Sequence, residues 1–138
     1  MSESAELPAA DAPVADNVAL FRLVPTDQCA AVDGEWEFQS AAFDNNDGDD
    51  MSVVLGDTLA LLERVPEDLP ARIFQDPARW GVAVVVTQYV RDEEGQLVLR
   101  TPTEMEPAHG DVRGAKNPKR RKRLKKHAEW VIRPQAPA

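Results

Sequence analysis

The chain has 138 residues, of which 43% are hydrophobic and 29% are charged, and its formal net charge is −8. This length and composition are typical of one globular domain. No apolar run approaches the roughly 20 residues of a transmembrane helix, and a single cysteine, Cys29, excludes a disulfide framework. Because the first residues lack the basic and apolar regions of a signal peptide, we expect a cytoplasmic protein that does not contact a membrane.

The first part of the chain predicts a tail followed by three strands. Residues 1–16 are rich in Ala, Pro, Ser and acids, which is typical of a disordered acidic tail. Residues 18–24 are apolar on both faces and predict an inner strand, whereas residues 35–43 alternate as a half-buried strand does. The acidic stretch 44–50 predicts a solvated turn or a weak calcium-binding loop without EF-hand spacing, and residues 51–55 predict a third strand.

The middle of the chain predicts short helices and a hairpin. Asp57 is suited to cap a helix that follows it, and residues 66–74 have the spacing of another helical turn. The valine-rich residues 81–90 predict a central strand buried on both faces. A hairpin loop at 92–95 would then return residues 96–100 as its partner strand.

The last part of the chain predicts a short edge strand at 108–114 and a final helix. Asn117 is suited to cap that helix and Pro118 to begin it. The helix is expected to cover residues 118–131, because Pro134 forbids its continuation.

These elements predict the α+β class, with a small mixed or antiparallel sheet of about five strands, two or three short helices and a basic C-terminal helix. The sequence divides into the acidic tail 1–16, one domain at 17–133 that includes the helix 118–131, and a short tail at 134–138.

The charge of the chain is divided between two segments. Residues 1–112 carry 23 acidic and 6 basic side chains, whereas residues 113–138 carry 10 basic and 1 acidic side chain. Such asymmetry is evidence about partners rather than about fold. The cations predicted to bind an anion are Lys116, Lys119, Arg120, Arg121, Lys122, Arg123, Lys125 and Lys126.

Three interpretations of this basic helix stay open. It is a solvated helix whose cations offset the acidic body, a binding surface for phosphate, RNA or DNA, or a nuclear-localisation signal. The acidic body and the lack of interleaved aromatic residues count against nucleic acid.

Two polar residues lie on otherwise apolar strand faces. Arg22 shares its predicted face with aliphatic residues, and Ser40 shares one with aromatic residues. A buried charge needs a partner, and the candidates are Glu104, Glu106 and His109. The more common interpretation is a structural Arg–Glu pair and a serine bonded to the backbone.

An arginine on the first strand, a serine on the second and a late Glu-x-Glu resemble the pattern of ADP-ribosyltransferases. The resemblance implies that Arg22 holds dinucleotide phosphates, that Ser40 braces the site and that Glu106 directs transfer, with Glu104 on the substrate side. The chain departs from the pattern because no second serine follows Ser40, a proline follows Glu106 directly, and the chain is short for that fold.

The stretches LFR, QSAAF, MSV, GVAVV and PAHGDV resemble, in that order, a set of small uncharacterised bacterial proteins. The resemblance covers most of residues 18–132 and implies a bacterial origin, but no activity.

Metal and nucleophile chemistry have weaker support in the sequence. His109 and Asp111 can share a strand face, but two ligands do not make a zinc site. No family signature surrounds Cys29, and we expect an inert thiol. We therefore expect no metal and no cofactor.

We expect a non-enzymatic interaction module that contacts nucleic acid or an acidic protein surface through its basic helix. The alternatives are an ADP-ribosyltransferase-like enzyme and an accessory or antitoxin-like partner protein, for which the acidic tail would be suited. The sequence leaves the oligomeric state open.

Overall fold

The computed structural model describes residues 6–46, 48–93 and 95–137. Its framework is a six-stranded antiparallel sheet with the strand order β6-β7-β4-β1-β5-β8. Those strands are β1 (Ala19–Pro25), β4 (Asp50–Leu55), β5 (Trp80–Val86), β6 (Leu97–Arg100), β7 (His109–Arg113) and β8 (Glu129–Ile132). A second sheet pairs β2 (Cys29–Val32) with β3 (Glu35–Phe38). The predicted α+β class is confirmed, with a larger sheet than expected.

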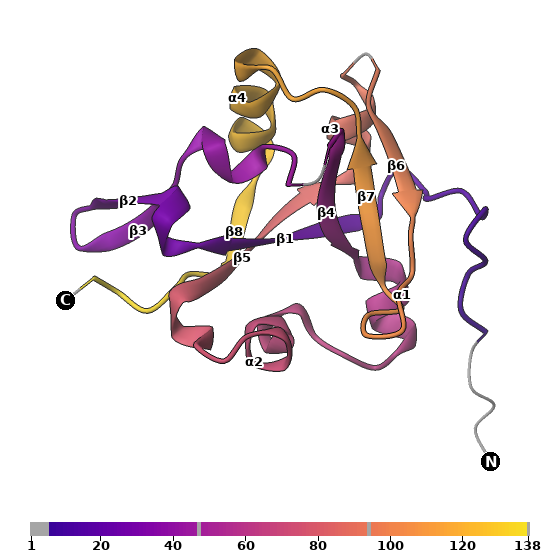
Figure 1. Cartoon of the computed structure of the whole chain (residues 1–138), viewed down its shortest axis with the longest axis horizontal. Helices are drawn as coiled ribbons and strands as arrows, with labels where there is room; N and C mark the ends of the chain where they lie inside the picture. The colour runs from indigo at the N-terminus through magenta and orange to yellow at the C-terminus, as the bar shows by residue number, and fades with distance from the viewer. Residues whose placement is uncertain (1–5, 47, 94, 138) are drawn as a thin grey trace.

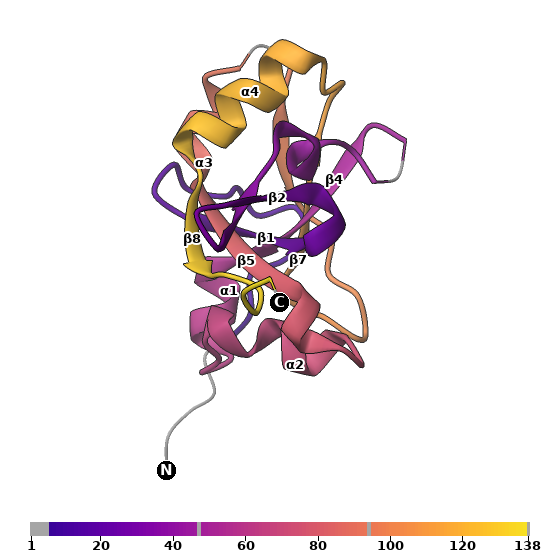
Figure 2. The same cartoon turned by 90° about the vertical axis from the view of Figure 1, so that its left-hand side faces the viewer.

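The described residues also form four α-helices, which lie on two sides of the sheet. They are α1 (Gly56–Leu61), α2 (Leu69–Ile73), α3 (Thr87–Arg91) and α4 (Pro118–His127). Figure 1 shows α4 at the top and α1 and α2 at the bottom, and the turned view in Figure 2 keeps α4 and α2 at opposite ends. Among the described residues, none of the helices has the length and apolar character required to cross a membrane.

The sheet separates two groups of buried apolar side chains. Leu20 of β1 belongs to the larger group, together with Leu124 of α4. Phe21, the next residue, packs against the smaller group, which contains Leu69 of α2. Because β1 pairs with β4 on one side and β5 on the other, the inner strand predicted at 18–24 is confirmed.

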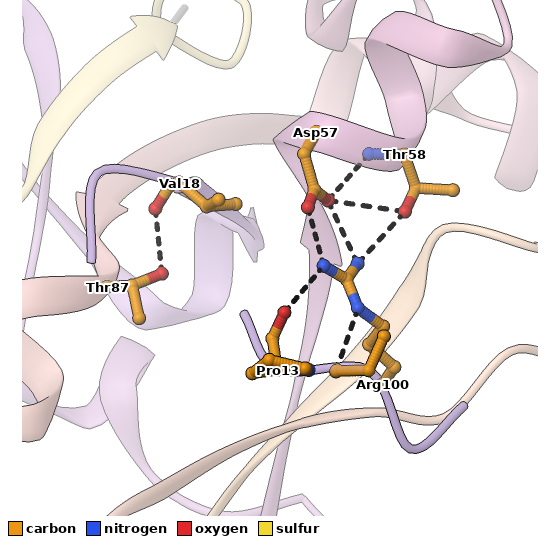
Figure 3. Close-up of polar contacts among 7 residues, drawn as sticks. Pro13, Val18, Asp57, Thr58, Thr87 and Arg100 are labelled. Atoms are coloured by element: carbon orange, nitrogen blue, oxygen red, sulfur yellow. Dashed lines mark hydrogen bonds and ion pairs between the residues drawn. The ribbon is translucent and has the colours of Figure 1, made fainter. Parts of the chain in front are cut away.

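The strand predicted at 81–90 ends earlier than expected. β5 ends at Val86, and Thr87 begins α3. The Thr87 hydroxyl donates to the carbonyl of Val18 at 2.8 Å, an interaction drawn in Figure 3. This bond fixes the bend from strand to helix, so the strand prediction is wrong for residues 87–90.

The predicted hairpin between residues 81–90 and 96–100 is also wrong. β6 pairs with β7, and β7 lies between β6 and β4 instead of forming the edge expected for residues 108–114. Of the predicted loop 92–95, Glu94 lies outside the described residues. The helical turn of α3 carries the chain away from β5 before β6 begins.

The final helix begins as predicted and ends earlier. The Asn117 side chain accepts from the Arg120 amide at 2.9 Å, and Pro118 is the first helical residue. The helix ends at His127, and residues 129–132 form β8 in place of the last helical turn expected up to residue 131. In β8, Trp130 pairs with Ala83 of β5.

The strand predicted at 35–43 is shorter, and Ser40 leaves it. β3 ends at Phe38, and Ser40 begins a 3-10 turn that ends at Phe43. β2 and β3 are joined by Asp33 and Gly34, which both have positive φ angles, 51° and 80°. This conformation is typical of a tight two-residue hairpin.

Residues 12–14, which the sequence assigns to a disordered tail, pack against the domain. Arg100 of β6 donates to the carbonyls of Ala12 and Pro13 at 3.2 Å each (Figure 3), and Val14 is only 2% exposed. These residues therefore belong to the domain, whereas residues 1–5 and 138 of the two predicted tails lie outside the described residues.

Asp57 does not cap α1 as predicted. Leu55 occupies the cap position, without a side-chain hydrogen bond, and Asp57 lies in the first turn. Its carboxylate accepts from the Thr58 amide at 2.7 Å and from both terminal nitrogens of Arg100 at 2.6 and 3.1 Å (Figure 3). The acid thus joins α1 to β6.

Candidate functional site

α4 is attached to the sheet by one side and exposes the other. Leu124 is 3% exposed and lies in the larger apolar group. The rest of the helix sequence, PKRRKRLKKH, is almost entirely basic. The helix is therefore held by its apolar side chain while most of its charged side chains face outward.

Lys116, which the sequence assigns to the anion-binding group, is used inside the protein. Its ammonium donates to the Asn45 amide oxygen at 2.9 Å and to the carbonyls of Val112 and Gly114 at 3.1 and 2.6 Å. Only 7% of the residue is exposed, and burial lowers its pKa to about 8. Lys116 therefore fixes the loop before α4.

Some arginines of α4 contact the acidic body. Arg121 pairs with Asp44 at 3.2 Å, and Arg123 pairs with Glu93 at 2.8 Å. Arg120 donates to a backbone carbonyl in the loop before the helix at 2.9 Å. These contacts fix the helix against neighbouring loops and use part of its positive charge.

Four lysines of α4 form an exposed surface that we call the lysine face: Lys119, Lys122, Lys125 and Lys126. Their spacings of three and four residues place them on one side of a helix, opposite Leu124. Among the described residues, none of the four has an acidic partner within 4.0 Å. Their charges are therefore available to an external anion.

An aromatic pair joins α3 to the last residue of α4, about 80–160° around the helix axis from the four lysines. The ring of Tyr89 in α3 stacks on the ring of His127 in α4, with centroids 4.1 Å apart and planes inclined by 6°. Tyr89 is 41% exposed. Sequence reasoning missed this pair because its two residues lie in separate helices.

A pocket of about 440 Å³ lies on the other side of the sheet, next to α2. Its apolar lining includes Phe21, Leu23, Val54, Phe74 and Trp80, and its polar lining includes Arg22, Gln28, Asn46, Arg72, Glu106 and His109. The volume lies within the range of about 300–1,000 Å³ that is typical of small-molecule sites.

Arg22 is bound to internal acceptors instead of a glutamate. Its guanidinium donates to the carbonyls of Ala42, Asp44 and Ser52 and to the side-chain oxygen of Asn46, at 2.8 to 3.3 Å. Burial lowers its pKa to about 10, against the opposing effect of the nearby Asp44 carboxylate. The predicted structural Arg–Glu pair is therefore not formed by Arg22.

The position of Arg22 also explains why the strand needs a polar residue there. β1 and β4 pair at Leu20–Leu55 and Phe21–Val54, and Arg22 is the next residue of β1. Its side chain bridges β1 to β4 and to the 3-10 turn, where backbone carbonyls need donors.

Glu106 is bound on both carboxylate oxygens. One oxygen accepts from Arg72 at 3.1 Å, and the other accepts from the amide of Ala108 at 3.3 Å and lies 3.9 Å from Arg64. Its side chain is 10% exposed. These contacts attach the connection between β6 and β7 to α2, a structural role that needs no substrate.

One ring nitrogen of His109 contacts Thr101 in the segment that connects β6 to β7. Its Nδ1 atom lies 3.0 Å from the carbonyl of Thr101 and 2.8 Å from the hydroxyl of the same residue. The contact to the carbonyl suits the tautomer with the proton on Nδ1, whereas the shorter contact to the hydroxyl suits either tautomer, because a hydroxyl both donates and accepts.

The structure brings together some of the residues of the ADP-ribosyltransferase pattern. Arg22, Glu106 and His109 all line the pocket, but Ser40 and the exposed Glu104 are not among its lining residues. The enzyme alternative stays a prediction, and NAD turnover at high protein concentration tests it.

The described residues place no group of three or more His, Cys, Asp or Glu side chains where a metal ion could bind, and Asp47 of the predicted calcium loop lies outside them. Burial, followed by the charges of Asp27 and Glu37, raises the pKa of Cys29 to about 11. The thiol is therefore protonated at neutral pH, which agrees with low reactivity.

No protein-family model, curated protein or solved structure matches the chain. The resemblances to bacterial proteins and to ADP-ribosyltransferases stay predictions.

Proposed function

We propose that the protein is a non-enzymatic module that binds single-stranded nucleic acid through the lysine face of α4. The observation that carries the proposal is the set of four exposed lysines without acidic partners among the described residues, on a chain whose net charge is −8. An acidic protein whose cations only offset its own carboxylates would pair them internally. Lys119, Lys122, Lys125 and Lys126 are not used in this way.

The geometry of α4 suits a strand of phosphates. Lys119 and Lys126 are seven residues apart, which spans about 10 Å of helix. The rings of Tyr89 and His127 stack at the last turn of the same helix, and an exposed aromatic ring is a surface on which a base can stack. Exposed lysines and an exposed aromatic pair at the same helix favour single strands over an acidic protein surface.

The repulsion from the acidic body limits the affinity. Two acidic side chains that contact the helix are paired with its arginines, since Asp44 contacts Arg121 and Glu93 contacts Arg123. These pairs reduce the negative potential next to the lysine face. We therefore expect weak binding that falls steeply with salt.

Fluorescence anisotropy with a mixed-sequence single-stranded oligonucleotide tests the proposal. Counterion release gives about a fivefold gain in affinity per phosphate contact at about 0.1 M salt, so Lys122→Gln should weaken binding about fivefold. Arg79→Gln, which removes the same charge from an exposed site near α2, is the matched control and should leave affinity unchanged.

Two results would contradict the proposal. One is equal affinity of the two variants, and the other is binding of an acidic polypeptide such as poly-glutamate without binding of any oligonucleotide. The second result would favour an acidic protein partner. Co-purification from the native host tests the accessory or antitoxin-like alternative.

A further inference from the structure

The pocket beside α2 has a flat aromatic wall. Phe74 follows α2, Trp80 begins β5, and their rings stack with centroids 3.6 Å apart and an interplanar angle of 6°. Both residues line the pocket, together with Phe21 and Leu23 of β1. Aromatic side chains of this kind favour a ligand that is itself a planar ring.

A buried acceptor without a partner also lines this pocket. Gln28 ends the 3-10 turn after β1, and its side-chain oxygen Oε1 is buried with no hydrogen-bond partner among the described residues. Buried polar atoms are nearly always satisfied, so an orphan at the wall of a cavity indicates a position for a donor that arrives with a ligand.

The second available acceptor is on His109. Its Nδ1 atom contacts the carbonyl and hydroxyl of Thr101, and in the tautomer that donates from Nδ1 to the carbonyl, Nε2 is a lone-pair acceptor. The charged groups of the lining are satisfied, because Arg72 contacts Glu106 and Arg22 donates to four internal acceptors. The remaining polar capacity of the pocket therefore suits N–H donors better than an ion.

We propose that the pocket binds a neutral, planar heteroaromatic ring carrying N–H donors, the chemistry of a nucleobase. The ring packs against Phe74 and Trp80 and donates to Gln28 Oε1 and His109 Nε2. The inference is independent of the proposed function, because α2 and α4 lie on opposite sides of the sheet (Figures 1 and 2).

The probes are adenosine, guanosine, cytidine and uridine, followed by amide NMR spectra of the full chain. We expect saturable shifts of the Phe21, Leu23 and Trp80 resonances with at least one nucleoside. Blocking the exocyclic or ring N–H groups of that nucleoside by methylation should weaken its binding about tenfold, which corresponds to the loss of about one hydrogen bond to a buried group.

Gln28→Leu separates a ligand-binding acceptor from a structural one. It removes an unsatisfied buried oxygen, so the melting temperature should stay unchanged or rise, while nucleoside binding weakens about tenfold. Gln88→Leu on the exposed surface of α3 is the matched control and should leave binding unchanged. Leu23→Trp, which fills the pocket, should abolish binding.

Several results would overturn the proposal. They are the absence of shifts with all four nucleosides at millimolar concentration, equal binding of the methylated analogue, and equal binding by the Gln28→Leu variant. A lower melting temperature in Gln28→Leu would show that the amide is structural. Replacing the lysine face with glutamines should not alter nucleoside binding, so failure of the pocket proposal and failure of the α4 proposal are distinguishable.

Discussion

Replacing Arg100 with methionine should destabilise the protein strongly. Its side chain is 6% exposed, and its guanidinium pairs with Asp57 in a two-point contact at 2.6 and 3.1 Å. It also donates to Thr58 and to the carbonyls of Ala12 and Pro13 (Figure 3). One side chain therefore holds α1, β6 and the N-terminal segment together.

The cost follows from the burial of the two partners. Removing one member of a buried ion pair costs about 3–5 kcal/mol, because the other charge is left without compensation. Asp57 keeps 30% of its side chain exposed and water can partly solvate it, so we expect about 3 kcal/mol, at the lower end of this range. The Arg91–Asp16 pair, with side chains 35% and 68% exposed, is the matched control, and Arg91→Met should cost less than about 1 kcal/mol.

The assay is urea unfolding followed by tryptophan fluorescence, at pH 7 and at lower pH. The hydrogen bond from Arg100 holds the pKa of the Asp57 carboxyl below its ordinary value. The pair therefore stabilises the fold fully above the unfolded-state pKa of about 3.9, and this contribution is lost as the pH falls through the folded-state pKa. When the pH falls from about 5 to about 2, the free energy of unfolding of the Arg100→Met variant should decrease by less than that of the unaltered protein.

Two results would refute the reasoning. One is a cost below about 1 kcal/mol for Arg100→Met, the range of exposed pairs. The other is a free energy of unfolding that decreases with falling pH as steeply in the Arg100→Met variant as in the unaltered protein. A double-mutant cycle with Asp57→Asn should give a coupling energy of about 1–3 kcal/mol.

Two further predictions concern other buried contacts. Lys116→Met removes a donor from three acceptors, of which the Gly114 carbonyl still accepts from the Asn45 amide, and should cost about 1–3 kcal/mol by urea unfolding. Because burial lowers the folded-state pKa of Lys116 to about 8 from 10.5, the stability of the unaltered protein relative to this variant should rise between those pH values. A difference in stability that stays constant with pH would contradict the assignment. Gly81→Ala should cost about 1–3 kcal/mol of stability, because a Cβ atom would lie 2.5 Å from Trp130 Cζ3 and 2.8 Å from the Ile132 carbonyl oxygen. An unchanged melting temperature would show that β8 does not pack against Gly81.

The fold was predictable from sequence where local chemistry and burial agree. Residues 18–24 are apolar on both faces, and β1 is indeed an inner strand. Asn117 and Pro118 form the predicted helix start because capping depends on neighbouring residues alone. The end of that helix was not predictable, since Ala128 and Val131 continue the i, i+4, i+7 apolar spacing that begins at Leu124. Residues 129–132 form a strand only through pairing with β5.

The candidate sites were only partly predictable. The basic segment of α4 is visible in the sequence, but which cations face solvent depends on distant acids such as Asp44 and Glu93. Arg22 was predicted to need a partner and Glu106 was a candidate for it, yet the contacts of both come from separate elements and loops whose relative positions no local pattern fixes. The orphaned oxygen of Gln28 carries no sequence signal, because its environment is created by the packing of separate elements.

The salt dependence of oligonucleotide binding tests the central claim about α4 most directly. Four lysine–phosphate contacts predict a slope of about −2.8 for the logarithm of the association constant against the logarithm of the salt concentration. Replacing Lys119, Lys122, Lys125 and Lys126 with glutamine should remove measurable binding without changing the melting temperature, because these side chains are exposed. The same slope and affinity in this variant would show that the lysine face is not the binding surface.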